Sequence, residues 1–197
     1  MRLLSWNVKG INVSDKWCLI KCQIDDTKGV IWLLQETKWS KAEIEAKMRV
    51  WKHQNGFFRQ SDGASGGLGI IWKHMNVKIS LVGEDKYWQY CLVTTLGQNE
   101  NFNLFNVYRP SSAGDKQALW DLLSFKLNNN TDGSCVVAGD FNVILSNIKK
   151  IGGIQRTGTS QKDFLDFVEK NHILDIVLKN GIFTWTNWIL GFSNIVE

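Results

Sequence analysis

The sequence predicts an α/β protein in which two β-sheets pack face to face and helices cover the outside of each sheet. Two observations lead to this prediction. Segments of strand length alternate with helical patterns at both ends of the chain, and five strand-like segments follow one another in the middle. Strands and helices arranged in this way are typical of layered α/β domains. We therefore expect an α/β sandwich.

The first third of the chain is predicted to run strand, helix, strand, helix. The two strands are the apolar segments 1–6 and 30–34. Ser14 is expected to cap the first helix, because apolar residues follow it at spacings of three and four. Ser40 with Glu43 three residues later matches a capping box and predicts the start of the second helix. The apolar positions of these two helices are Trp17, Ile20, Ile24, Ile44, Met48 and Trp51.

The remaining elements follow from short apolar runs and from helical spacing. Turn residues separate the five middle strands, which predicts an antiparallel meander. The predicted strands of the meander are 57–58, 68–72, 77–82, 90–96 and 102–108. A helix at 115–126, a buried strand at 135–138, a helix at 161–170 and a strand at 182–186 complete the prediction.

Composition is that of an ordinary globular protein, with 44% hydrophobic and 21% charged residues in 197. Without repeats, low-complexity segments or a linker, residues 1–197 are expected to form a single domain. The net charge of +4 permits a nucleic-acid partner without requiring one. The sequence contains neither an apolar run of membrane-spanning length nor a signal peptide, so we expect a soluble, intracellular protein without membrane contact. The four cysteines are expected to be buried free thiols.

Polar side chains stand at the ends of four predicted strands. Asn7, Glu36 and Tyr108 each end or follow an apolar run, and Asp140 and Asn142 follow the run at 135–138. Each residue alone is readily explained as part of a turn or loop, but four coincidences of this kind are not. Carboxylate and amide oxygens without cysteine are hard ligands that suit Mg²⁺ or Mn²⁺ better than zinc.

The motifs around these residues resemble those of the endonuclease/exonuclease/phosphatase superfamily, in order and in approximate spacing. They are Ser5-Trp6-Asn7, Gln35-Glu36-Thr37, Asn106-Val107-Tyr108-Arg109-Pro110 and Gly139-Asp140-Phe141-Asn142. Two further motifs resemble the endonuclease domains of plant LINE-type (non-LTR) retrotransposons. These are Ser65-Gly66-Gly67-Leu68-Gly69-Ile70 and Phe183-Thr184-Trp185-Thr186-Asn187. The resemblance covers essentially the whole chain.

The resemblance implies a four-layer α/β sandwich and a role for each polar residue. Glu36 corresponds to the main metal-binding carboxylate, with Asn7 beside it. Asp140 corresponds to the residue that activates or orients the attacking water, and Asn142 to its neighbour that holds the phosphate or the nucleophile. Tyr108 corresponds to a hydroxyl near the scissile phosphate. The implied reaction is metal-assisted hydrolysis of a phosphodiester.

The resemblance also implies the biological context. The cofactor would be Mg²⁺, with Mn²⁺ as a possible substitute, and the substrate would be DNA that the enzyme nicks. A monomer is expected, localised to the nucleus if it acts on genomic DNA. In a full-length relative, a reverse transcriptase domain would lie on the same chain.

The sequence departs from the family pattern at its end and at Lys9. Family members continue with a Leu-Asp-Arg strand and a terminal Ser-Asp-His, whereas this sequence ends with Asn194-Ile195-Val196-Glu197. We therefore expect a C-terminally incomplete domain without its last strands, with exposed sheet edges and strongly reduced activity. Some relatives have a metal-binding carboxylate at the position of Lys9, so weaker metal binding is expected.

Two other functions remain open on the sequence alone. The first is a phosphatase or an RNA nuclease of the same superfamily. These enzymes share the Gly-Asp-x-Asn motif, so that motif does not distinguish them from a DNA endonuclease. Alternatively, the chain is a catalytically inactive remnant or a nucleic-acid-binding module, which the missing C-terminal segment favours.

Overall fold

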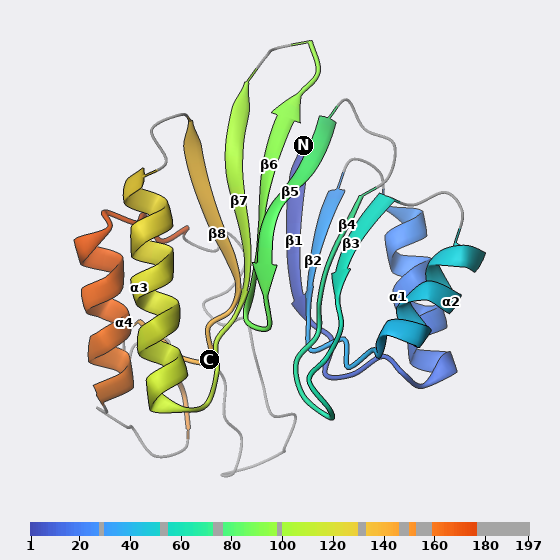
Figure 1. Cartoon of the computed structure of the whole chain (residues 1–197), viewed down its shortest axis with the longest axis horizontal. Helices are drawn as coiled ribbons and strands as arrows, with labels where there is room; N and C mark the ends of the chain where they lie inside the picture. Colours follow the sequence, from blue (N-terminus) through green and yellow to red (C-terminus); the bar gives the residue numbers. More distant parts are fainter. Residues whose placement is uncertain are drawn as a thin grey trace. The chain divides into compact units, whose positions relative to one another are not determined.

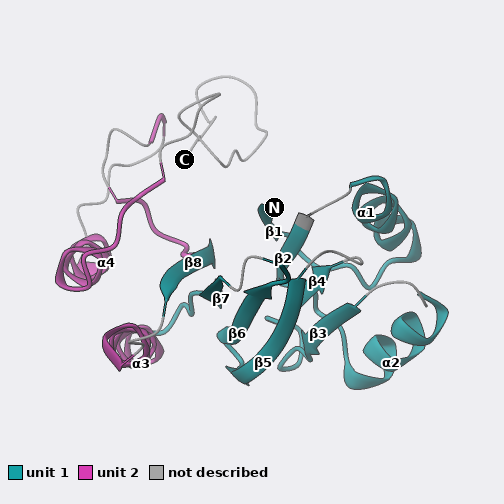
Figure 2. Ribbon diagram, turned by 90° about the horizontal axis from the view of Figure 1, so that it is seen from above, with its two compact units in different colours: residues 1–112, 130–140 teal, residues 113–129, 141–197 magenta. Residues whose placement is uncertain are grey.

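The computed structural model describes residues 1–27, 30–51, 55–72, 77–97, 100–129, 133–145, 150–152 and 159–176. The chain divides into two compact units, shown in Figure 2. The first unit comprises Met1–Ser112 and Asn130–Asp140, and the second comprises Ala113–Asn129 and Phe141–Glu197. The predicted strand at 182–186 and the motif at 183–187 lie outside the described residues.

The strands of the described residues form two mixed sheets of four strands each, both within the first unit. The first sheet has the order β1-β2-β4-β3, with β1 parallel to β2 and the other pairs antiparallel. Its strands are β1 (Arg2–Asn7), β2 (Val30–Gln35), β3 (Asn55–Arg59) and β4 (Leu68–Trp72). The second sheet has the order β5-β6-β7-β8, antiparallel except for the parallel pair β7 and β8. Its strands are β5 (Val77–Asp85), β6 (Trp88–Thr95), β7 (Asn101–Tyr108) and β8 (Ser134–Asp140).

The two sheets pack face to face, as predicted (Figure 1). The apolar side chains between them form one core. Ile31, Leu33 and Ile70 of the first sheet are fully buried against Cys91 and Leu104 of the second. Removing this apolar surface from water is the main force that holds the sheets together. The predicted fold class, an α/β sandwich of two packed mixed sheets, is therefore confirmed.

Helices α1 (Ser14–Asp26) and α2 (Lys41–Val50) pack on the outer face of the first sheet (Figure 1). Three tryptophans form the centre of this second core, because the ring centroid of Trp17 lies 4.7 Å from that of Trp39 and 5.0 Å from that of Trp51. The predicted capping box of α2 is present, with Ser40 and Glu43 each accepting a backbone N–H of the other. The prediction that Ser14 caps α1 is wrong: Ser14 is already helical, and the N-cap is Val13, which offers no side-chain acceptor.

The second unit contains α3 (Ala113–Asn129) and α4 (Thr159–Lys170), which contact each other. Trp120 on α3 stacks on Phe164 and Phe167 of α4, with ring centroids 5.3 Å and 4.7 Å apart. Phe141 stacks on the same tryptophan at 6.3 Å. Trp120, Phe164 and Phe167 are buried, as are Leu119 and Leu123 of α3, whereas Phe141 is half-buried.

Two expectations are wrong. The five middle strands do not form one meander, because β3 and β4 pair within the first sheet and β5, β6 and β7 within the second. Three of the four thiols are exposed, those of Cys18, Cys22 and Cys135, and Cys91 alone among the cysteines is buried. Cys18 and Cys22 lie on the face of α1 away from its buried residues, although their sequence neighbours are apolar. No helix among the described residues has the length and hydropathy needed to cross a membrane.

Candidate active site

The parallel strand pairs of the two sheets bring distant polar residues together at the ends of the strands. In the first sheet, Asn7 ends β1 opposite Gln35, and Glu36 follows directly. In the second sheet, Tyr108 ends β7 opposite Asp140, which ends β8. Parallel partners end at the same edge of a sheet, where binding sites of α/β proteins are commonly built.

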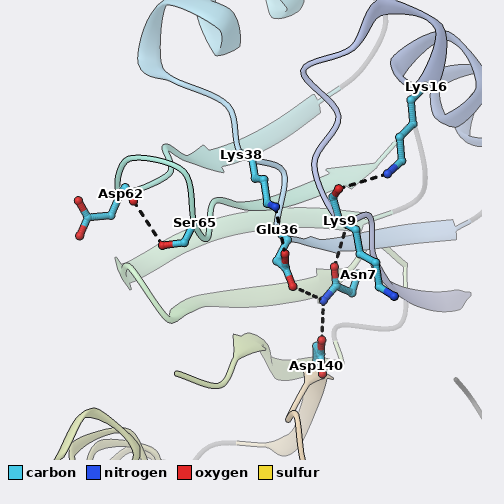
Figure 3. Close-up of polar contacts among 8 residues, drawn as sticks. All are labelled: Asn7, Lys9, Lys16, Glu36, Lys38, Asp62, Ser65 and Asp140. Carbon is cyan, nitrogen blue, oxygen red and sulfur yellow. Dashed lines mark hydrogen bonds and ion pairs between the residues drawn. The ribbon is translucent and has the colours of Figure 1, made fainter. Parts of the chain in front are cut away.

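The side-chain amide of Asn7 links the two sheets at this edge (Figure 3). Its Nδ2 donates to Oε1 of Glu36 at 2.8 Å and to Oδ2 of Asp140 at 2.5 Å. Its Oδ1 accepts the backbone N–H of Lys9 at 2.9 Å. One amide thus holds two carboxylates near a single point, and they come from segments more than a hundred residues apart.

Glu36 occupies a backbone conformation that side chains rarely adopt. Its φ is +53°, in the left-handed region, and Lys38 two residues later has φ +57°. Such residues cost on the order of 1–3 kcal/mol and cluster at functional sites, where surrounding contacts hold them. Here the Glu36 carbonyl accepts the N–H of Gly10 at 2.6 Å. The Lys38 ammonium lies 3.7 Å from Oε2 of the carboxylate, so a cation already faces Glu36 from one side.

Tyr108 contributes a phenol that stays protonated at neutral pH. Burial, the largest cause, and the nearby negative charge of Glu36 together raise the pKa of Tyr108 to about 12. The phenol also donates a hydrogen bond to Glu36, and Asp140 and Tyr87 add smaller contributions in the same direction. A phenol with this pKa can donate a hydrogen bond but is not a base under physiological conditions.

The structure therefore places four of the predicted residues, Asn7, Glu36, Tyr108 and Asp140, in one group. Asn142 lies two residues beyond Asp140 and belongs to the second unit, where it is exposed with φ +47°. Lys38 was not predicted from the sequence. Its signal would have been a basic residue two positions after a carboxylate that ends a strand.

The donor atoms of this group fit a hard divalent cation. Glu36 and Asp140 offer only oxygens, and their shared contact with the Asn7 amide shows that both carboxylates reach the same point. Oxygen ligands of this kind are preferred by Mg²⁺ and Mn²⁺. In the described part of the chain, no three His, Cys, Asp or Glu side chains gather closely enough to form a metal site by themselves.

Comparison with solved structures finds the same fold in proteins of low sequence identity. An AP endonuclease from Leishmania major (LMAP) has a TM-score of 0.66 at 12% identity, over 86% of this chain and 65% of that one. A 3'-5' exonuclease (NExo) from Neisseria meningitidis has a TM-score of 0.64 at 17% identity, over 98% and 85% of the two chains. D. rerio TDP2 complexed with single-strand DNA product has a TM-score of 0.56 at 14% identity, over 98% and 82%. The chain thus spans just under two thirds of the Leishmania enzyme.

A search of curated proteins finds no match to this sequence. The model of the Endonuclease/Exonuclease/phosphatase family, however, matches residues 4–192, which is nearly the whole chain and includes all five predicted site residues. The chain therefore belongs to the endonuclease/exonuclease/phosphatase family.

Proposed function

We propose that this protein is a metal-dependent phosphodiesterase, and more specifically an endonuclease of retrotransposon origin that nicks DNA. The observation that carries the proposal is the Asn7 amide that joins the carboxylates of Glu36 and Asp140. Family membership supports the reaction class. The LINE-type motifs in the sequence support the substrate and the origin.

The cation would be held by Glu36, with Asn7 beside it. In this structure the Asn7 Nδ2 faces both carboxylates and its Oδ1 accepts the Lys9 N–H, so Asn7 would act as a metal ligand through Oδ1 only with its amide turned over. Bound at this point, Mg²⁺ or Mn²⁺ would neutralise charge that develops on the phosphate. The Lys38 ammonium, 3.7 Å from Glu36, lowers the negative charge available to a cation. Together with a lysine at position 9, it supports the expectation of weak metal binding.

The protein groups would divide the remaining work among them. Asp140 would accept a proton from the attacking water and orient its lone pair towards the phosphorus. With substrate bound, Tyr108 would turn its phenolic hydrogen from Glu36 to a non-bridging phosphate oxygen, a role for which its raised pKa is suited. Asn142 would contact the phosphate or the water through its amide.

Several properties belong to the same proposal. The two units would form one domain, because the family model extends over both of them. The enzyme would act as a monomer and, on genomic DNA, in the nucleus. A longer protein of this type would carry a reverse transcriptase domain.

The alternatives predict different substrates or none. A phosphatase or an RNA nuclease would use the same residues, and an inactive remnant would bind nucleic acid without cleaving it. DNA is favoured over these because one structurally similar protein, TDP2, is complexed with a DNA product and another is an AP endonuclease.

The test is nicking of supercoiled plasmid by the purified protein, with Mg²⁺ and with EDTA. Glu36→Gln and Asp140→Asn keep the size of each side chain and remove its charge, so both should abolish nicking. Glu45→Gln, an exposed position on α2, is the matched control and should leave the rate unchanged. Mg²⁺-dependent nicking lost in both site variants supports the proposal. Folded protein that does not nick plasmid contradicts it, and labelled RNA and a phosphomonoester assayed in parallel identify the alternative.

A further inference from the structure

A row of buried amide side chains crosses the core between the two sheets. Gln35 at the end of β2, Asn106 on β7 and Gln89 on β6 are each at most 1% exposed. The Nε2 of Gln35 donates to Oδ1 of Asn106 at 2.7 Å, and the Nδ2 of Asn106 donates to Oε1 of Gln89 at 3.2 Å. Gln89 in turn donates to Oε2 of Glu84 at 3.1 Å, at the exposed end of the row. We call these three amides the inter-sheet amide row.

Asn106 is the centre of this row and also binds the backbone of the first sheet. Its Nδ2 lies 3.2 Å from the carbonyl oxygen of Leu34 on β2 and 3.2 Å from that of Gly69 on β4. An unpaired buried amide is strongly unfavourable, so a polar row inside an apolar core persists only with its partners in place. An apolar core would hold the sheets together equally well. The amides therefore specify where the sheets meet more than how strongly they adhere.

The row lies directly behind the candidate active site. Gln35 immediately precedes Glu36, and Asn106 stands two residues before Tyr108 on the same strand. Gly69, which Asn106 contacts, follows the Gly66 and Gly67 carbonyls that accept the N–H groups of Lys38 and Thr37. Asn106 thus contacts both strands that hold the segment from Glu36 to Lys38. That segment carries two residues with positive φ, which need surrounding contacts to persist.

We infer that Asn106 is a positioning residue: through the inter-sheet amide row it sets the place of Glu36 relative to Tyr108. It acts through Gln35, Leu34 and Gly69 and does not touch the substrate. The effect on catalysis rests on the proposed function, whereas the effect on the local backbone does not. Small displacements of site groups reduce rates by large factors, so this residue should matter more for turnover than for substrate binding.

Asn103 offers a matched control on the same strand. It is 2% exposed and accepts the Tyr90 hydroxyl at 2.7 Å, so its loss also leaves a buried polar group without its partner. It lies on the opposite face of β7, three residues further from the strand end. Asn106→Leu and Asn103→Leu therefore remove comparable buried amides, one inside the row and one outside it. If either leucine variant fails to fold, Asn106→Ser and Asn103→Ser repeat the comparison with a smaller, hydroxyl-bearing side chain.

Hydrogen exchange in the folded state tests the inference without any assay of activity. The amide protons of Gly10, Thr37, Lys38 and Tyr108 donate to backbone carbonyls around the site and report on its order. After correction for global stability, we expect them to exchange at least about tenfold faster in the Asn106 variant than in the Asn103 variant. Equal exchange in the two variants overturns the inference.

Kinetics with plasmid or a short duplex then test the link to catalysis. We expect the Asn106 variant to lose about 10–100-fold in kcat with KM nearly unchanged, and the Asn103 variant to retain wild-type kcat within about threefold. Equal losses in both variants reduce Asn106 to a contributor to stability and contradict the inference. An inactive wild type contradicts the proposed function instead, and the exchange comparison alone then decides the positioning role.

Discussion

Replacing Gly139 with alanine should displace the carboxylate of Asp140 without altering it. Gly139 has φ +151°, which side chains rarely adopt, and pairs with Val107 across the parallel strands β7 and β8. A Cβ added there would lie 2.7 Å from the backbone nitrogen and carbonyl carbon of Val107, and nearer still to its carbonyl oxygen. Ordinary contacts begin at 3.4 Å, so the backbone of one strand must move away from the other.

The size of the effect follows from these distances. Backbone strain at such a φ costs about 1–3 kcal/mol, and forcing extra atoms into a packed region costs a similar amount. We expect the free energy of unfolding to fall by at least about 2 kcal/mol. The backbone must shift by several tenths of an ångström or more, and it does so one residue before Asp140. We therefore also expect a loss of about 100-fold in kcat from the displaced carboxylate.

Urea unfolding followed by tryptophan fluorescence measures the first quantity, and plasmid nicking of the folded fraction measures the second. Gly63→Ala is the control, because Gly63 also has a positive φ, +61°, but an added Cβ would meet no atom within 4 Å. This control should lose only about 1–2 kcal/mol and keep its activity. If Gly139→Ala unfolds at the same urea concentration as Gly63→Ala and nicks at the wild-type rate, the strands tolerate the side chain and the reasoning fails.

Three further predictions concern protonation, capping and thiol access. The pKa of Tyr108 is about 12 in the folded protein against about 10 in an unfolded chain, so its contribution to stability is present below about pH 10 and is lost as the pH rises towards 12. Urea melts at about pH 9 and about pH 11 should therefore show a smaller alkaline loss in Tyr108→Phe than in the wild type, and equal losses would contradict this. Ser40→Ala removes the capping box with Glu43 and should lower the free energy of unfolding by about 1 kcal/mol. Ser80→Ala, at an exposed strand position, is the control and should change it little; equal effects of the two variants in urea melts would argue against the cap. Burial raises the pKa of Cys91 to about 12, so a thiol reagent should label it only after unfolding, while the exposed Cys18 and Cys22 react in the folded protein. Burial also raises the pKa of Cys135, to about 11, so this exposed thiol should react more slowly than those two; equal labelling of Cys91 and Cys18 in the folded protein would be inconsistent with the fold.

Local signals in the sequence identified most elements of the described chain. Apolar spacing located α1, α2, α3 and α4, and the Ser40 capping box gave the start of α2 to the residue. These signals depend on neighbours within one or two turns, and local physics therefore decides them. Which strands pair is decided by contacts between distant segments. For that reason the assignment of β3 and β4 to the first sheet could not be read from the run of middle strands.

The candidate site shows the same division between local and distant information. Polar residues at strand ends marked Asn7, Glu36, Tyr108 and Asp140 as candidates, and the structure groups these four. The sequence did not indicate that the Asn7 amide nitrogen faces both carboxylates, because its contact with Asp140 spans 133 residues. The amide contact between Gln35 and Asn106 spans 71 residues. Both lie in motifs in which the ionisable residues, Glu36 and Tyr108, were the predicted site residues.

The pattern of parallel pairs explains why this site is assembled from four separate segments. Strands β1 and β2 are parallel and joined through α1, and β7 and β8 are parallel and joined through α3. A parallel pair needs a long crossover, so the two residues that end its strands are far apart in sequence but adjacent in space. Each sheet thus contributes one such pair, Asn7 with Glu36 and Tyr108 with Asp140, and these pairs meet only if the sheets pack in one register. The apolar core between the sheets tolerates small slips, whereas the Asn7 amide and the inter-sheet amide row require defined partners on both sides. Polar contacts across the core are therefore the means by which this fold converts two separate strand ends into a single site.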